Sequence, residues 1–151
     1  MTITYQKELF YKTMHELAPL FLREWQEVIG DNPTLQDINV DWDKYIQMEL
    51  SGLLVLITVR DKDRLIGYAL DVIHHHLHFK SVLYCFIDAF WVLPEYRDGV
   101  TDTGLIEENE IYLIEAGVKR INFAVNPSLW LYKLMKKMQY TRTECVLAKW
   151  L

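Results

Sequence analysis

The sequence has few cysteines, no excess of positive charge and no long apolar run, and each absence excludes a class of protein. Its two cysteines, Cys85 and Cys145, fall in apolar, strand-like runs, so we expect buried free thiols in a reducing compartment rather than a disulfide. The net charge of −5 disfavours a nucleic-acid partner, because such proteins carry a basic footprint. No segment approaches the ~20 apolar residues that cross a bilayer, and the first residues lack the layout of a signal peptide. We therefore expect a cytoplasmic protein with no membrane partner.

The first third of the chain predicts two helices joined by a polar connection. Apolar residues recur at helical spacing over residues 7–29, where Pro19 predicts a kink or a division into two pieces. This helix is expected to end in the polar residues 30–40, which open with a glycine. Asp41 then predicts the N-cap of a short helix over Trp42–Leu50.

The middle of the chain predicts three consecutive strands. Leu53–Val59 and Leu65–Ile73 are apolar runs of strand length on either side of a charged turn, which is the pattern of an antiparallel hairpin. The segment His74–Lys80 joins them to a longer strand, Ser81–Val92. No internal repeat or low-complexity stretch interrupts the chain, so we expect residues 1–151 to form a single domain.

The last third alternates helices and strands. Apolar spacing predicts a helix over Leu105–Ala116, a strand over Val118–Val125, and a second helix that starts near Asn126–Ser128 and closes at Gln139-Tyr140. The apolar run around Cys145 predicts a final strand. The order strand–helix–helix–three strands–helix–strand–helix–strand is mixed α/β, with a hairpin meander followed by a βαβ crossover.

The loop after the long strand has the composition of an anion-binding site. Backbone N–H groups that converge at a helix N-terminus bind phosphates, and glycine lets the backbone approach the anion. An arginine at position 97 adds a charge-assisted contact. A diphosphate loop here would comprise Leu93, Arg97, Asp98, Gly99, Val100, Thr101, Asp102, Thr103 and Gly104. The alternative is a plain strand–helix turn that binds no ligand.

Several motifs resemble the GNAT N-acetyltransferase family. The strand Phe86–Val92, the segment Leu93-Pro-Glu-Tyr-Arg97 and the helix–strand–helix order up to Tyr140 resemble the acyl-CoA-binding half of that fold. Other segments resemble a GNAT subgroup common in phage and prophage genomes, and the likeness spans roughly residues 5–150. These segments are Val40–Glu49, Leu65–Ala69, His76–Lys80 and Leu93–Arg97.

The resemblance implies an α/β fold with a central, mostly antiparallel sheet, flanking helices, and a parallel pair formed by the fourth and fifth strands. It also implies acetyl-CoA as co-substrate. The chemistry of this family is direct attack of an amine on the thioester, which needs a base for the ammonium proton and an acid near the leaving thiolate.

Residues expected to carry that chemistry depart from the family pattern. The loop of GNAT proteins resembles Arg/Gln-x-x-Gly-x-Gly/Ala, which places Val100 and Asp102 at the two glycine positions. At an effective dielectric of ~20, like charges ~4 Å apart repel by about 4 kcal/mol, so Asp102 would have to point away from a diphosphate. On the last helix, Met135 stands where many members carry a tyrosine acid, and Gln139 replaces a glycine. Tyr132, one turn earlier, is either a substitute acid or an ordinary surface tyrosine.

Asp88 is the candidate base. An acid inside an apolar strand costs several kcal/mol to bury unless it is paired or has a purpose, and GNAT proteins carry active-site acids on this strand face. The alternative is a structural, hydrogen-bonded aspartate. In GNAT folds the segment containing His76 and His78 lies where the acceptor enters, so these histidines are candidates for substrate contact or proton relay. No cysteine or carboxylate stands at ligand spacing from them, so we expect no metal.

Two functions of different classes follow. The first is an acetyl-CoA-dependent N-acyltransferase of phage type, acting in the host cytoplasm on an amine-bearing small molecule or protein. The second is a catalytically impaired GNAT-fold binding or structural protein, such as a virion component or an inhibitor of a host protein. GNAT proteins often dimerise, and Trp130 and Trp150 would serve either a homodimer contact or ordinary packing.

Overall fold

A five-stranded sheet forms the centre of the protein. The computed structural model describes residues 1–29, 37–149 and 151. The strands are β1 (Ile3–Glu8), β2 (Leu54–Asp61), β3 (Arg64–His76), β4 (Phe79–Val92) and β5 (Val118–Phe123). They stand in the order β1-β2-β3-β4-β5, antiparallel except for β5, which runs parallel to β4. The predicted mixed α/β architecture, with one parallel pair in a mostly antiparallel sheet, is confirmed.

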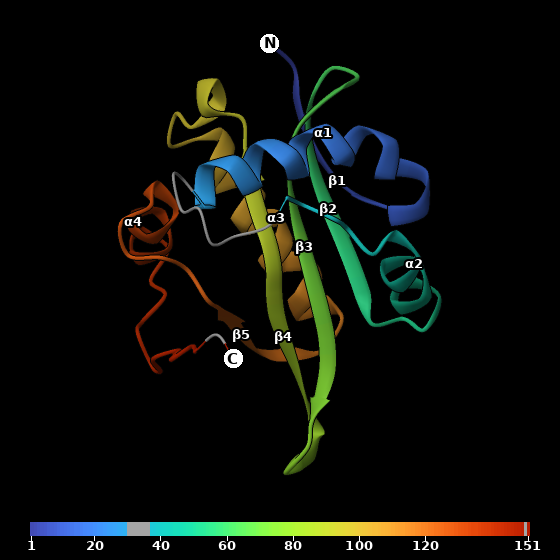
Figure 1. The fold of residues 1–151 in the computed structure, drawn as a ribbon, viewed down its shortest axis with the longest axis vertical. Helices are drawn as coiled ribbons and strands as arrows, with labels where there is room; N and C mark the ends of the chain where they lie inside the picture. The colour runs from blue at the N-terminus through green and yellow to red at the C-terminus, as the bar shows by residue number, and fades with distance from the viewer. Residues whose placement is uncertain (30–36, 150) are drawn as a thin grey trace.

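Helices cover both faces of this sheet. They are α1 (Phe10–Ile29), α2 (Trp42–Leu50), α3 (Thr101–Glu115) and α4 (Trp130–Lys137), with a 3-10 turn at Pro94–Tyr96. In Figure 1, α1 crosses the front of the sheet, α3 lies behind it, and α4 stands to the left. α2 begins where the sequence predicts, because the Asp41 carboxylate accepts a hydrogen bond of 3.0 Å from the backbone N–H of Lys44.

α1 contains Pro19 and is nevertheless one helix, so the predicted division into two pieces is wrong. Leu17, Leu20 and Phe21 are buried against the sheet on either side of the proline. Burying each large apolar side chain contributes roughly 1.5–3 kcal/mol, which together outweighs the ~3 kcal/mol that proline costs inside a helix. The expected end of this helix and the connection through residue 36 lie outside the described residues, as does Trp150.

α3 begins four residues earlier than the apolar spacing predicts, at Thr101 instead of Leu105. Its first turn forms early because the Asp98 carboxylate accepts a hydrogen bond of 2.7 Å from the Thr101 backbone N–H. The second half of the expected diphosphate loop is therefore helical. β5 is also shorter than predicted and ends at Phe123.

The C-terminal segment lacks the expected final strand. Cys145 is exposed and the residues around it form no described strand, so both the strand and the burial predicted there are wrong. An apolar run alone does not make a strand, because the run also needs a sheet edge to pair with. Cys85 is buried and free, as predicted. Asn126–Ser128 forms a turn before α4, which starts at Trp130.

A β-bulge and the early end of β5 open the sheet at one place. The register of the β3–β4 pair slips between Leu70 and Asp71, so that Asp88 is an extra residue without a partner on β3. The parallel pairing of β4 with β5 ends at Ile87 and Phe123. In the described part of the chain, β4 beyond the bulge therefore pairs with β3 alone, and its other edge is open.

Candidate functional site

A cleft of about 670 Å³ lies where β4 and β5 diverge. Its walls come from α1, residues 38–41, α2, β4 at and after the bulge, and the chain from the end of β5 to the start of α4. Its acidic side chains are Glu24, Glu27, Asp41 and Asp88. Lys44 is the one basic side chain among the described lining residues. Of the sequence-predicted site residues, Asp88 alone is among these described lining residues.

Asp88 points into this cleft from the bulge. Its side chain is exposed instead of enclosed in the strand, because the extra residue turns it out of the sheet. The Tyr45 hydroxyl of α2 donates a hydrogen bond of 2.6 Å to Asp88 Oδ2. Burial, together with this hydrogen bond, raises the pKa of the Tyr45 phenol above its ordinary value. Asp88 is thus positioned to hold a cation or to accept a proton.

Glu24 of α1 is a second carboxylate in the cleft, and the sequence reasoning missed it. The buried Tyr68 hydroxyl donates a hydrogen bond to Glu24 Oε2. Burial raises the pKa of Glu24 to about 7; the Tyr68 hydrogen bond opposes this shift, and the charge of Asp88 adds to it. The available signal was helical spacing: Glu24 follows Phe21 by three residues and Leu17 by seven, so it lies on the apolar face of α1.

Arg97 is held by internal partners. Its Nη1 and Nη2 donate to the two oxygens of the Glu27 carboxylate at 2.8 and 2.7 Å, and its Nε donates to the Val92 carbonyl at 2.8 Å. The guanidinium also lies 5.4 Å from the ring centroid of Trp91 and 4.2 Å from that of Trp130. Burial tends to raise the pKa of Glu27, yet the hydrogen bonds from Arg97 and Trp91 hold it below its ordinary value. Arg97 thus joins α1, β4 and α4 beside the cleft.

The N-terminus of α3 is already occupied by a carboxylate of the chain itself. Asp98 Oδ1 accepts hydrogen bonds from the backbone N–H groups of Val100 at 2.9 Å and Thr101 at 2.7 Å. These backbone hydrogen bonds hold the pKa of Asp98 below its ordinary value. A diphosphate at this helix end would have to compete with Asp98 for the same donors.

The other residues of the predicted loop have structural partners. Leu93 is in the core, Thr103 Oγ1 donates to the Gly99 carbonyl at 2.9 Å, and the Asp102 side chain is buried and accepts from the Thr103 N–H at 3.0 Å. Gly104 lies under the Tyr5 ring, where a Cβ would stand 2.3 Å from the hydroxyl oxygen. A side chain at position 104 would therefore displace the Tyr5 ring from its place against α3.

α4 brings a lysine to this loop. Lys137 Nζ lies 3.8 Å from the point where a Cβ on Gly99 would stand, and Gly99 has a φ of +80°. The charge of Lys137 would favour an anion at this place, although the lysines of α4 look like a solvated helix face in the sequence. Met135 is buried in the core, and Tyr132 is half-buried and outside the described cleft lining. Gln139 has a φ of +67°, a conformation that favours glycine.

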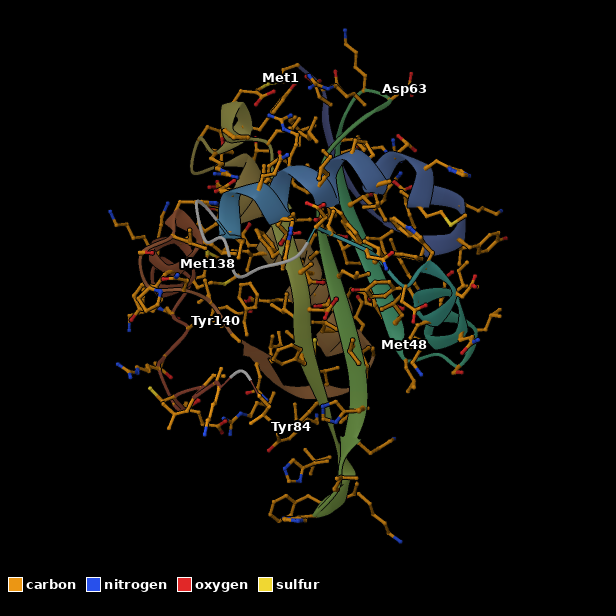
Figure 2. The ribbon with its side chains drawn as sticks, in the orientation of Figure 1. Met1, Met48, Asp63, Tyr84, Met138 and Tyr140 are labelled. Atoms are coloured by element: carbon orange, nitrogen blue, oxygen red, sulfur yellow. The ribbon has the colours of Figure 1, made fainter. Side chains whose placement is uncertain are left out.

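The histidines lie at the end of the β3–β4 hairpin, which projects below the rest of the molecule (Figure 1). His76 packs on Tyr84, with ring centroids 4.9 Å apart, and its Nδ1 accepts a hydrogen bond of 3.1 Å from the His78 N–H. Figure 2 labels Tyr84 in the lower part of the sheet, above the hairpin end. The structure therefore does not bring His76 and His78 to the cleft that holds Asp88.

Two further properties concern the described residues as a whole. No three of their histidine, cysteine, aspartate or glutamate side chains come together in a group that could hold a metal ion. Within the same residues, no helix has the length and apolar character needed to span a membrane.

The fold of the chain is shared with solved acetyltransferases. An aminoglycoside acetyltransferase from an uncultured soil metagenomic sample, solved with sisomicin, has a TM-score of 0.75 at 10% identity, covering 99% of this chain and 95% of that one. Glucosamine-6-phosphate N-acetyltransferase from Arabidopsis thaliana has a TM-score of 0.72 at 10% identity, covering 99% of both chains. A predicted acetyltransferase from Clostridium acetobutylicum, solved with acetyl-CoA, has a TM-score of 0.71 at 16% identity, covering 98% of this chain and 96% of that one.

No family model matches the chain, and no curated protein matches its sequence. At 10–16% identity the likeness establishes the fold alone, which is the GNAT acetyltransferase fold that the motifs imply.

Proposed function

We propose that this protein is an acetyl-CoA-dependent N-acetyltransferase whose acceptor is a small molecule with an amine group. The observation that carries the proposal is the open edge of β4 after the bulge at Asp88, inside a cleft that also holds a second carboxylate. Unpaired backbone donors and acceptors on a strand edge can hold an extended, amide-containing chain. The similar structures, with an aminoglycoside acetyltransferase and a glucosamine-6-phosphate N-acetyltransferase among them, support an amine acceptor.

The open edge of β4 fits the extended, amide-containing part of acetyl-CoA (its arm) well. The loop from Arg97 to Gly104 fits the diphosphate less well. The arm would follow the open edge of β4 in the cleft. The diphosphate would meet the segment from Arg97 to Gly104 together with Lys137, where Asp98 holds two of the backbone donors and Arg97 is bound to Glu27. Binding there requires the Asp98 carboxylate to leave the N–H groups of Val100 and Thr101.

Acetyl-CoA supplies an activated acetyl thioester to such a site. The chain contributes the electrostatics: Asp88 holds the acceptor ammonium and is the first candidate for its proton, and Tyr45 fixes the orientation of that carboxylate. Tyr132 stays a predicted acid for the leaving sulfur, and His76 and His78 stay predicted acceptor contacts, although none of the three is among the described residues that line the cleft.

Calorimetry with acetyl-CoA tests the binding half of this proposal, and thiol release in the presence of a mixed panel of primary amines tests the transfer. We expect saturable heat at micromolar to millimolar acetyl-CoA, and amine-dependent thiol release that Asp88→Asn reduces at least 100-fold. Absence of detectable binding at millimolar acetyl-CoA would contradict the proposal.

The second candidate is a GNAT-fold binding or structural protein without catalysis, such as a virion component or an inhibitor of a host protein. The filled N-terminus of α3 and the internal partners of Arg97 favour it. Acetyl-CoA that co-purifies with the protein, detected by mass spectrometry, would count against this candidate.

Further parts of the proposal rest on the sequence. They are a phage-type origin, a single domain over residues 1–151, a homodimer and a cytoplasmic location. Size-exclusion chromatography with light scattering would test the dimer.

A further inference from the structure

Two carboxylates with tyrosine partners form the acidic end of the cleft. Asp88 accepts from Tyr45, and Glu24 accepts from Tyr68. In the described part of the chain neither carboxylate forms an ion pair, whereas Glu27, one helical turn from Glu24, is paired with Arg97. Negative charge on the partly buried Glu24 is costly unless a cation compensates it, and the neighbouring charge of Asp88 adds to that cost. A ligand cation would provide that compensation.

The rest of the cleft is apolar. Phe21 and Tyr45 form one wall, with ring centroids 6.3 Å apart, and Phe123 and Val125 line another part. Beyond the charged side chains, few described lining residues offer a polar side chain. A polyhydroxylated, polycationic acceptor would lose hydration here without finding enough partners. An apolar body would instead gain from burial.

We propose that this end of the cleft is an acceptor subsite for a primary amine with an apolar, ring-bearing body, its ammonium held between Asp88 and Glu24. The inference rests on the proposed function, since it names the acceptor class of that same site. An acceptor of this class would differ from the aminoglycoside and the glucosamine 6-phosphate for which the similar structures are named.

Within this subsite Glu24 is the final proton acceptor. The N–H bond of the ammonium breaks, and its proton goes to Asp88 and from there to a Glu24 carboxylate oxygen. The freed electron pair of nitrogen forms the new C–N bond as the C–S bond of the thioester breaks, and the sulfur leaves with that electron pair as a thiolate. The thiolate then takes the second proton of the acylated nitrogen, so that the products are an amide and a thiol. The groups that face Glu24 are Tyr68 of β3, Asp88 of β4, Tyr45 of α2 and Glu27 of its own helix. A carboxylate with a pKa of about 7 is suited to this transfer near neutral pH.

Equilibrium binding without acetyl-CoA tests the subsite independently of acyl transfer. Calorimetry would compare 2-phenylethylamine with its neutral analogue 2-phenylethanol and with the polycation spermidine. We expect 2-phenylethylamine to bind at least 10-fold more tightly than either. Equal binding of amine and alcohol, tighter binding of spermidine, or no amine binding at 10 mM would overturn the inference.

Matched variants locate the cation. Asp88→Asn and Glu24→Gln should each weaken 2-phenylethylamine about 10-fold and leave 2-phenylethanol within twofold. The control is Asp63→Asn, which makes the same charge change in the exposed β2–β3 turn at the top of the molecule (Figure 2) and should change neither affinity. An equal loss of 2-phenylethylamine affinity in Asp63→Asn would contradict the placement of the ammonium between Asp88 and Glu24.

The pH dependence of amine affinity gives a second readout. Because protonation neutralises Glu24, affinity for 2-phenylethylamine should fall several-fold from pH 8 to pH 6, and Glu24→Gln should abolish this dependence; a profile unchanged in the variant would exclude Glu24. Tighter binding of the amine than of the alcohol, without any acetyl-CoA binding, would support the subsite and contradict the proposed transferase function. Acetyl-CoA binding without a preference for the amine would support the transferase function and contradict the subsite.

Discussion

The cleft and the N-terminus of α3 are connected by β4 and the short segment after it, yet their charged groups are satisfied in different ways. In the cleft, Asp88 and Glu24 have tyrosine partners and no ion pair in the described part of the chain. At α3, the backbone donors already have an anion, the carboxylate of Asp98. The two described carboxylates of the cleft thus have no cationic partner in the chain, whereas an external anion at α3 would have to displace an internal one.

This difference separates two requirements that an acetyltransferase has to meet together. Acceptor recognition needs unpaired charge beside the open edge of β4, and the described cleft provides it. Co-substrate binding needs free donors at a helix N-terminus, and here it depends on moving Asp98. Under the proposed function, the cleft would meet the first requirement as it stands and the α3 region would meet the second only after Asp98 moves, so each requirement can be tested separately.

The largest expected effect concerns Arg97, which lies between the two regions. Arg97→Ala should lower the free energy of unfolding by about 3 kcal/mol, because it leaves the Glu27 carboxylate without its two hydrogen bonds and removes the guanidinium from Trp91 and Trp130. Urea denaturation measures the change. Arg97→Lys is the control and should recover part of the loss, since lysine keeps the charge but not the bidentate geometry.

A stability near that of the wild type in Arg97→Ala, combined with a large loss of acetyl-CoA affinity, would contradict this view. Arg97 would then belong to the α3 region as a diphosphate ligand, as the loop motif predicts.

The next effect concerns Glu24 and pH. The folded-state pKa of about 7 lies above the ~4.3 of an unfolded glutamate, so the folded state binds this proton more tightly. The contribution of Glu24 to stability therefore declines as pH rises from about 4.5 through 7. Glu24→Gln should be more stable than the wild type by about 2 kcal/mol at pH 8.5, with little difference at pH 4.5.

Thermal unfolding at the two pH values measures this effect. Glu115→Gln, an exposed position in α3, is the control and should show no such pH dependence. A destabilised Glu24→Gln at pH 8.5 would mean that the carboxylate already has a cationic partner in the protein, and the contrast with α3 would fail.

Much of the fold follows from the sequence because its causes are local. Apolar runs of strand length on either side of a charged turn predict β2 and β3, and Asp41 predicts the start of α2. The predictions fail where long-range packing decides. α1 continues through Pro19 because the sheet buries its face on both sides, and no strand forms around Cys145 in the described segment.

The candidate site was less predictable for the same reason. Asp88 could be found as an acid in an apolar strand, but the bulge that exposes it is a matter of register between two strands. Composition predicts an anion-binding loop but not the direction of its side chains. The internal partners of Arg97 and Asp98 therefore could not be foreseen from the sequence. Glu24 lies more than 60 residues before Asp88 in the sequence, and its hydrogen bond with Tyr68 joins α1 to β3, which no local pattern predicts.

A smaller effect is expected at Asp98 itself. Asp98→Ala frees the N–H groups of Val100 and Thr101, so acetyl-CoA affinity should rise about 10-fold, while stability falls by about 1 kcal/mol through loss of the cap. Calorimetry measures the affinity. Asp98→Asn, the control, keeps a capping oxygen without the charge and should give an intermediate gain. Weaker binding in both variants would show that Asp98 assists the ligand.

The smallest effect tests whether the glycine that Gln139 replaces matters for chemistry. Gln139 has a φ of +67° directly after the end of α4, so Gln139→Gly should relieve about 1 kcal/mol of backbone strain in thermal unfolding. Lys62→Gly, at a φ of +55° in the β2–β3 turn, is the control and should gain similarly. Neither change should alter acetyl-CoA affinity more than twofold, because the barrier there is the Asp98 carboxylate. A 10-fold gain in Gln139→Gly alone would shift the weakness of the α3 region from Asp98 to the α4 end that carries Lys137.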